Sequence, residues 1–233
     1  LRNMLQHNNG NRSLINDDLK FVISWKRSTH TGSLKKLCLV FLLLAMPFLF
    51  VNSSISAENL SYDQSGRIRT GLKMFRSMLL ADRDIEKKIN KEDETDIVFL
   101  YQSNASKAKH LARSFVRMGR LENKGQIKGS QIKVHMTREL DFIRETDLKP
   151  AAIFLVDPFI ESKVKAVARY GKEHQIITFS PYEGDVENGI LGGLVVESRI
   201  HPFINMKTLE ESNIRIKPFY LKVAQAYEPN KIK

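Results

Sequence analysis

The sequence predicts an α/β fold, a single-domain three-layer sandwich with a mainly parallel sheet and an antiparallel C-terminal strand pair. Apolar runs of strand length alternate with amphipathic stretches, as in βαβ crossovers. Ile97–Tyr101 and Ala151–Val156 are almost entirely apolar, which is typical of parallel strands buried on both faces. Leu191–Glu197 and Ile200–Ile204 are joined by only two residues, so this pair must be antiparallel.

Residues 34–57 have the order of a secretory signal peptide. Lys35 and Lys36 precede the apolar run Leu37–Val51, and small and polar residues follow it up to a cleavage site at Ala57. The run is shorter than the about 20 residues of a membrane span. We therefore expect a periplasmic or secreted protein, with an uncleaved membrane anchor as the alternative. Residues 1–33 are an unassigned leader, and 58–233 form the domain, with its core at about 67–228.

The cysteine count narrows the chemistry of the exported part. Cys38 is the one cysteine of the chain and lies inside the predicted signal peptide. Cleavage would leave a cysteine-free mature chain, without disulfides, thiolate metal sites or cysteine nucleophiles. The formal net charge of +11 includes the basic leader, and the remaining excess is spread along the chain without aromatic interleaving. We expect no nucleic-acid partner.

Periodicity places the remaining elements in order. The spacing of apolar residues predicts helices at Arg67–Asn90, Ala105–Val116 and Ile160–Glu173, together with a short helix capped by Thr137. Further strands are expected at Ile132–Met136 and Ile176–Phe179. Pro202 cannot donate to a ladder, which places its strand at an edge or a bulge. The chain should end with helices at Lys207–Ser212 and Phe219–Tyr227, the latter burying Phe219, Leu221, Val223 and Ala224.

Ligands of open α/β sheets bind beside the carboxyl ends of parallel strands. Three loops follow such strands here, at Gln102–Ser106, Asp157–Phe159 and Ser180–Asp185. Their polar residues are the candidate ligand- or partner-binding residues: Ser103, Asn104, Ser106, Asp157, Ser180, Tyr182, Glu183 and Asp185. Helix capping and a solvated acidic loop are the simpler interpretation of the same residues.

No catalytic or metal signature accompanies these loops. His110, His135, His174 and His201 have no zinc-ligand spacing, and we expect neither metal nor cofactor. A hydrolase triad of Ser180, His174 and Asp157 is the one enzymatic alternative, and no nucleophile-elbow pattern supports it. We therefore expect a protein that is not an enzyme.

The C-terminal third resembles the end of YfiR-like periplasmic proteins. In that family a Gly-rich strand and a return strand ending in Asn precede a helix, an extended link and a closing helix. The matching positions are Gly192, Gly193, Ile204, Asn205, Leu209, Ile214, Ile216, Leu221 and Ala224. The resemblance implies a signalling module that represses a membrane-bound diguanylate cyclase. The cysteines that the family uses for disulfides are absent after cleavage.

Two functions follow from these observations. The first is an exported, non-enzymatic regulatory or binding protein that acts on a membrane sensor or signalling partner such as a diguanylate cyclase. The alternative is a periplasmic solute-binding protein for a small polar or anionic ligand. A stable complex without turnover would indicate the first, and thermal stabilisation by a small ligand would indicate the second.

Overall fold

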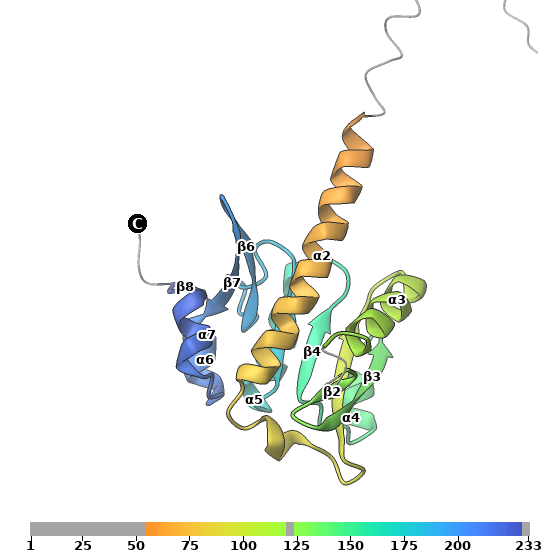
Figure 1. Cartoon of the computed structure of the whole chain (residues 1–233), viewed down its shortest axis with the longest axis vertical. Coiled ribbons are helices and arrows are strands. Elements are labelled where there is room, and N and C mark those ends of the chain that lie inside the picture. The colour runs from red at the N-terminus through yellow and green to blue at the C-terminus, as the bar shows by residue number, and fades with distance from the viewer. Residues whose placement is uncertain (1–54, 120–123, 230–233) are drawn as a thin grey trace, which may run out of the picture. The chain divides into compact units, whose positions relative to one another are not determined.

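In the described part of the chain, eight strands form one sheet in the order β2-β3-β1-β4-β5-β6-β7-β8 (Figure 1). The computed structural model describes residues 55–119 and 124–229. The predicted leader and most of the predicted signal peptide lie outside these residues. Residues 55–233 make up one compact unit.

The strands are β1 (Glu94–Leu100), β2 (Gln126–Ile127), β3 (Ser130–Thr137), β4 (Ala152–Leu155), β5 (Ile177–Ser180), β6 (Gly192–Val196), β7 (Ile200–Asn205) and β8 (Gln225–Tyr227). The helices are α2 (Ile55–Ala81), the 3-10 helix η2 (Ile85–Lys88), α3 (Ala105–Val116), α4 (Asp141–Glu145), α5 (Glu161–Glu173), α6 (Met206–Ser212) and α7 (Pro218–Val223).

Five consecutive strands, β3, β1, β4, β5 and β6, run parallel, and β6 pairs antiparallel with β7. This arrangement confirms the predicted fold class. Two short strands were not predicted: β2 pairs antiparallel with β3, and β8 pairs parallel with β7. The parallel strands bring the loops after β1, β4 and β5 to one edge of the sheet, called here the carboxyl edge.

Alternate residues of each central strand point to opposite faces of the sheet. Each face packs against helices, so the domain has three layers. In β1, Ile97 and Phe99 pack with α2 and α3 in a first core, whereas Val98 and Leu100 pack with α4 and α5 in a second. Phe75 of α2 is fully buried at the centre of the first core. Its ring lies 5.3 Å from those of Phe115 and Phe154, and 5.5 Å from that of Phe179. In Figure 1, α2 crosses the front of the sheet.

The connection from β5 to β6 is unusual because it joins two parallel strands without a helix. Side chains from outside the loop support its backbone instead. The Asn205 side-chain amide donates to the Val186 carbonyl at 2.7 Å, and the Thr208 hydroxyl donates to the Gly189 carbonyl at 3.0 Å. Thr178 accepts the N–H of Leu191 at 3.0 Å. This loop is therefore part of the folded body.

The predicted closing helix is too long, and two of its four predicted buried residues are exposed, whereas Leu221 and Ala224 pack against the first core. Helix α7 ends at Val223, and the residues after Ala224 form β8. Tyr220 is the buried side chain of α7, and its hydroxyl donates to the Met74 carbonyl of α2. Phe219 is 60% exposed and Val223 is 59% exposed. The residues after Ala224 pair with β7, and this pairing keeps them extended although the spacing of their apolar residues suits a helix.

Three further boundaries differ from the sequence-based prediction. Helix α2 begins at Ile55 and ends at Ala81, and Ile85 belongs to η2. Thr137 ends β3, and α4 begins only at Asp141. Strand β7 is not an edge along its whole length, because β8 pairs with it from Phe203 onward. Pro202 lies just before that ladder, where its missing N–H leaves no hydrogen bond unmade.

Candidate functional site

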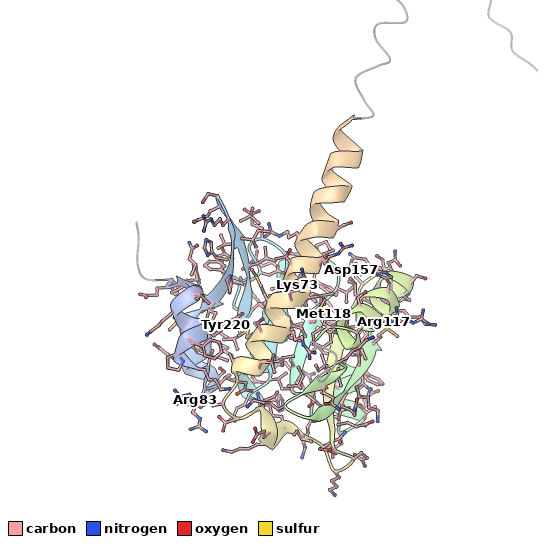
Figure 2. All side chains as sticks on the ribbon, in the orientation of Figure 1. Lys73, Arg83, Arg117, Met118, Asp157 and Tyr220 are labelled. Carbon is pink, nitrogen blue, oxygen red and sulfur yellow. The ribbon has the colours of Figure 1, made fainter. Side chains whose placement is uncertain are left out.

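The predicted loops do meet, and Asp157 is the residue that joins two of them. It directly follows Val156 at the end of β4, and Figure 2 places it at the upper, carboxyl edge of the sheet. Its Oδ2 accepts the backbone N–H groups of Gln102 at 2.9 Å and Ser103 at 3.3 Å. The side chain is 9% exposed. Asp157 thus holds the loop after β1 against the end of β4.

Lys107, in the first turn of α3, extends this cluster to the third loop. Its Nζ lies 3.0 Å from Asp157 Oδ1 and 3.3 Å from the Tyr182 hydroxyl. The Tyr182 hydroxyl in turn donates to the Val156 carbonyl at 2.5 Å. The Lys107 side chain remains 32% exposed. An ammonium group has three donors, so the third stays available at the surface.

The N-terminus of α3 lies beside this ammonium group. Asn104 is its N-cap, as predicted, and Asn104 Oδ1 accepts the N–H of Lys107 at 2.8 Å. Ser103 and Ser106 are exposed. Among the described residues, the N–H groups of Ala105 and Ser106 have no acceptor, as is usual in the first turn of a helix. The open helix end therefore presents donors toward solvent.

The side chains of Ser180 and Asp185 lie inside the loop after β5, so the prediction of a solvated acidic loop is wrong at Asp185 and holds at Glu183. Both are buried, and the Ser180 hydroxyl donates to Asp185 Oδ2 at 2.5 Å. Ser180 Oγ also accepts the N–H of Tyr182 at 3.1 Å. This pair shapes the interior of the loop and is not available to a ligand. Glu183 alone of the loop's candidate carboxylates is exposed.

The surroundings shift the pKa values of three of these groups. Burial raises the pKa of the Asp157 carboxyl, but the Gln102 N–H and the Lys107 ammonium together lower it below its usual value. Burial, followed by the charge of Asp157, raises the pKa of the Tyr182 hydroxyl well above its usual value. Burial also raises the pKa of Asp185. At neutral pH Asp157 is therefore ionised and Tyr182 is a hydrogen-bond donor.

Sequence reasoning missed Lys107 and Arg67. Lys107 stands three residues after the predicted cap Asn104, which is the first turn of α3, and this spacing could have indicated it. Arg67 on α2 donates from Nε to the Pro181 carbonyl at 2.5 Å. It approaches from a helix more than a hundred residues away in sequence, and no local signal points to that contact.

The described residues contain no group of three or more His, Cys, Asp and Glu side chains arranged to hold a metal ion. His135 lies 2.6 Å from Asp96, and the His174 ring lies 4.3 Å from that of Tyr170. The suggested triad of Ser180, His174 and Asp157 does not form. The Ser180 hydroxyl bonds to Asp185, and Asp157 bonds to Lys107 and the loop after β1.

No protein-family model and no curated protein matches the chain. Several solved structures are similar to part of it, and two of them are as follows. The first is an ABC domain from Streptococcus pneumoniae in complex with L-Trp, with a TM-score of 0.43 and 16% identity over 64% of this chain and 60% of that one.

The second is a conserved domain protein from Vibrio cholerae, with a TM-score of 0.43 and 13% identity over 61% of this chain and 58% of that one. The chain thus spans about three fifths of the length of each of these structures. None of the helices in the described ranges is both long enough and apolar enough to cross a membrane.

Proposed function

We propose that the chain is a non-enzymatic binding domain that holds a small anionic or zwitterionic ligand at the carboxyl edge of its sheet. The observation that carries the proposal is the position of Lys107. Its ammonium group is partly exposed, is held by Asp157 and Tyr182, and lies at the open N-terminus of α3. Helix N-termini and ammonium groups both favour negative charge.

The ligand's carboxylate or similar group would accept from the free N–H groups of the first turn and from Lys107. The exposed hydroxyls of Ser103 and Ser106 would supply further donors. Glu183, exposed in the neighbouring loop, could bind a positively charged end of a zwitterion. Because Asp157 already accepts three hydrogen bonds and its pKa is lowered, it is poorly suited to act as a base. The arrangement therefore favours capture over turnover.

Thermal unfolding of the purified chain with a panel of amino acids and dicarboxylates tests this proposal. A ligand at a hundredfold excess over its dissociation constant should add about 2.7 kcal/mol to the free energy of unfolding. Lys107→Met should abolish that gain. The control Lys109→Met changes an exposed lysine of the same helix and should retain it. Equal stabilisation of both variants would exclude this site.

A second candidate function is contact with a membrane signalling partner, as the resemblance to YfiR-like proteins implies. Phe219 and Val223 support it, because they are exposed one turn apart on α7, within the segment that carries the resemblance. Isolated apolar residues are common on protein surfaces, so the pair needs a direct test. Capture of a sensor protein from envelope extracts should be lost in Phe219→Ser/Val223→Ser and kept in Lys107→Met.

We also propose that the protein acts after export. The basic, apolar and small-residue order of residues 34–57 supports this. N-terminal sequencing of the protein recovered from the envelope tests it, since a mature terminus next to Ala57 is expected. Recovery of uncleaved chain in the cytosolic fraction would contradict export.

A further inference from the structure

A second concave site lies at the opposite, amino edge of the sheet. It is a cavity of about 1060 Å³, formed between η2 and the loop after it, the beginnings of β1 and β3, the link from α4 to β4, and the end of α5. Small-molecule sites usually measure roughly 300–1,000 Å³. None of the residues discussed at the carboxyl edge lines this cavity.

Two carboxylates of the cavity wall, Asp84 and Asp96, already accept hydrogen bonds from neighbouring side chains. Asp84 accepts Arg215 Nε at 2.7 Å and the Lys87 ammonium at 2.8 Å. Asp96 is 6% exposed and accepts the Asn90 side-chain amide at 2.8 Å, with His135 Nε2 at 2.6 Å from its other oxygen. Little acceptor capacity is therefore left on these two groups.

The lysine and arginine side chains of the cavity wall have N–H groups that are not used in these hydrogen bonds. Lys133 bonds to Glu94 at 2.7 Å, which leaves two of its three N–H groups. Arg215 directs two of its five N–H groups at Asp84. Lys91 and Lys149 have no ion-pair partner among the described residues. In all, six Lys and Arg side chains line the cavity against four Asp and Glu side chains, and the remaining two carboxylates, Glu92 and Asp147, are exposed.

We propose that this cavity binds a small anion that carries several oxygen acceptors, such as a polycarboxylate or a phosphorylated metabolite. Donors exceed acceptors around the cavity, and a ligand rich in acceptors satisfies that excess. The imidazoles of His135 and His174 also line it and can donate to the same ligand. The volume exceeds that of inorganic phosphate, so a larger polyanion should bind more tightly.

Proton NMR of the full chain at low ionic strength tests this site, with citrate and inorganic phosphate as probes. Citrate should shift the imidazole resonances of His135 and His174 and leave those of His110 and His201 in place. The double variant Lys91→Gln/Lys149→Gln should weaken citrate binding by at least about tenfold, since charge-assisted hydrogen bonds are among the strong ones. Both lysines are exposed, so the fold should survive.

Lys109→Gln is the control, since it removes an exposed charge that does not line the cavity, and citrate should bind it as it binds the parent. Lys107→Met separates the two sites: it should leave the His135 and His174 shifts intact even if the carboxyl-edge proposal is wrong. The cavity proposal is overturned if citrate moves neither imidazole. It is equally overturned if the double variant binds citrate as tightly as the parent does.

Discussion

The ammonium group of Lys107 lies 3.0 Å from the carboxylate of Asp157, although fifty residues separate the two in the sequence. The same carboxylate accepts two backbone N–H groups of the loop after β1. One buried side chain therefore holds the carboxyl edge together and positions the cation of the proposed site. Stability and binding should both depend on its charge.

Asp157→Asn should lower the free energy of unfolding at pH 7 by about 1–3 kcal/mol, the usual cost of impairing hydrogen bonds to a charged group. The pKa of Asp157 is below its usual value in the folded protein. Its contribution is therefore present above the unfolded-state pKa of about 3.9 and is lost as the pH falls through the folded-state pKa.

Urea unfolding of parent and variant at pH 7 and at pH 3 measures this dependence, and the difference should shrink at pH 3. Asp141→Asn is the control, because that carboxylate is exposed and, among the described residues, forms an ion pair only with exposed Arg144. Its effect should stay within about 0.5 kcal/mol. An unchanged deficit of Asp157→Asn at both pH values would show that its charge does not matter.

The central sheet could be predicted because its signals are local. Apolar runs such as Ile97–Leu100 and Ile153–Val156 must be buried on both faces, and the short link before Ile200 allows only an antiparallel pair. The cap at Asn104 is equally local. All of these features depend on neighbours within a few residues.

The missed features depend on residues far away in the sequence. The last strand, β8, is three residues long and exists through its pairing with β7. Asp185 has acidic neighbours typical of a solvated loop, yet it turns inward to Ser180. Phe219 and Tyr220 are adjacent, and only packing against α2 decides that Tyr220 is the buried one.

Asp185→Asn should stabilise the protein at neutral pH by roughly 1 kcal/mol, because a buried ionised carboxylate is replaced by a neutral group. Burial raises the pKa of Asp185, the Ser180 hydroxyl lowers it, and Glu187 raises it, with a net increase. A raised pKa contributes stability below the unfolded-state value of about 3.9, which is lost as the pH rises through the folded-state pKa.

The advantage of Asp185→Asn should therefore be present at pH 7 and shrink toward pH 4 in thermal unfolding. Glu183→Gln changes an exposed carboxylate two residues away. Its unfolding midpoint should stay close to that of the parent across this pH range. A variant less stable than the parent at pH 7 would show that the Ser180 contact needs the charge.

Gly193→Ala should destabilise the protein by about 1–3 kcal/mol, as overpacking in a core does. A Cβ at Gly193 would lie 2.6 Å from Val186 Cγ2 and 2.7 Å from the Ser180 backbone oxygen. Gly66→Ala is the matched control, since nothing lies within 4 Å of its added Cβ on α2. That change should stabilise by about 0.5–1 kcal/mol. Equal effects of the two changes in urea unfolding would contradict the close packing of the β5–β6 loop.

Phe75→Ala should cost about 3–5 kcal/mol, the range for removing a fully buried aromatic side chain. Three phenylalanine rings pack against Phe75, one from α3 and two from β4 and β5, so its loss leaves a cavity between α2 and the sheet. Phe219→Ala removes the same atoms from a side chain that is 60% exposed and should change the free energy by less than about 0.5 kcal/mol. Chemical unfolding of both variants compares them directly. A small loss in Phe75→Ala would mean that α2 is not seated on this face of the sheet.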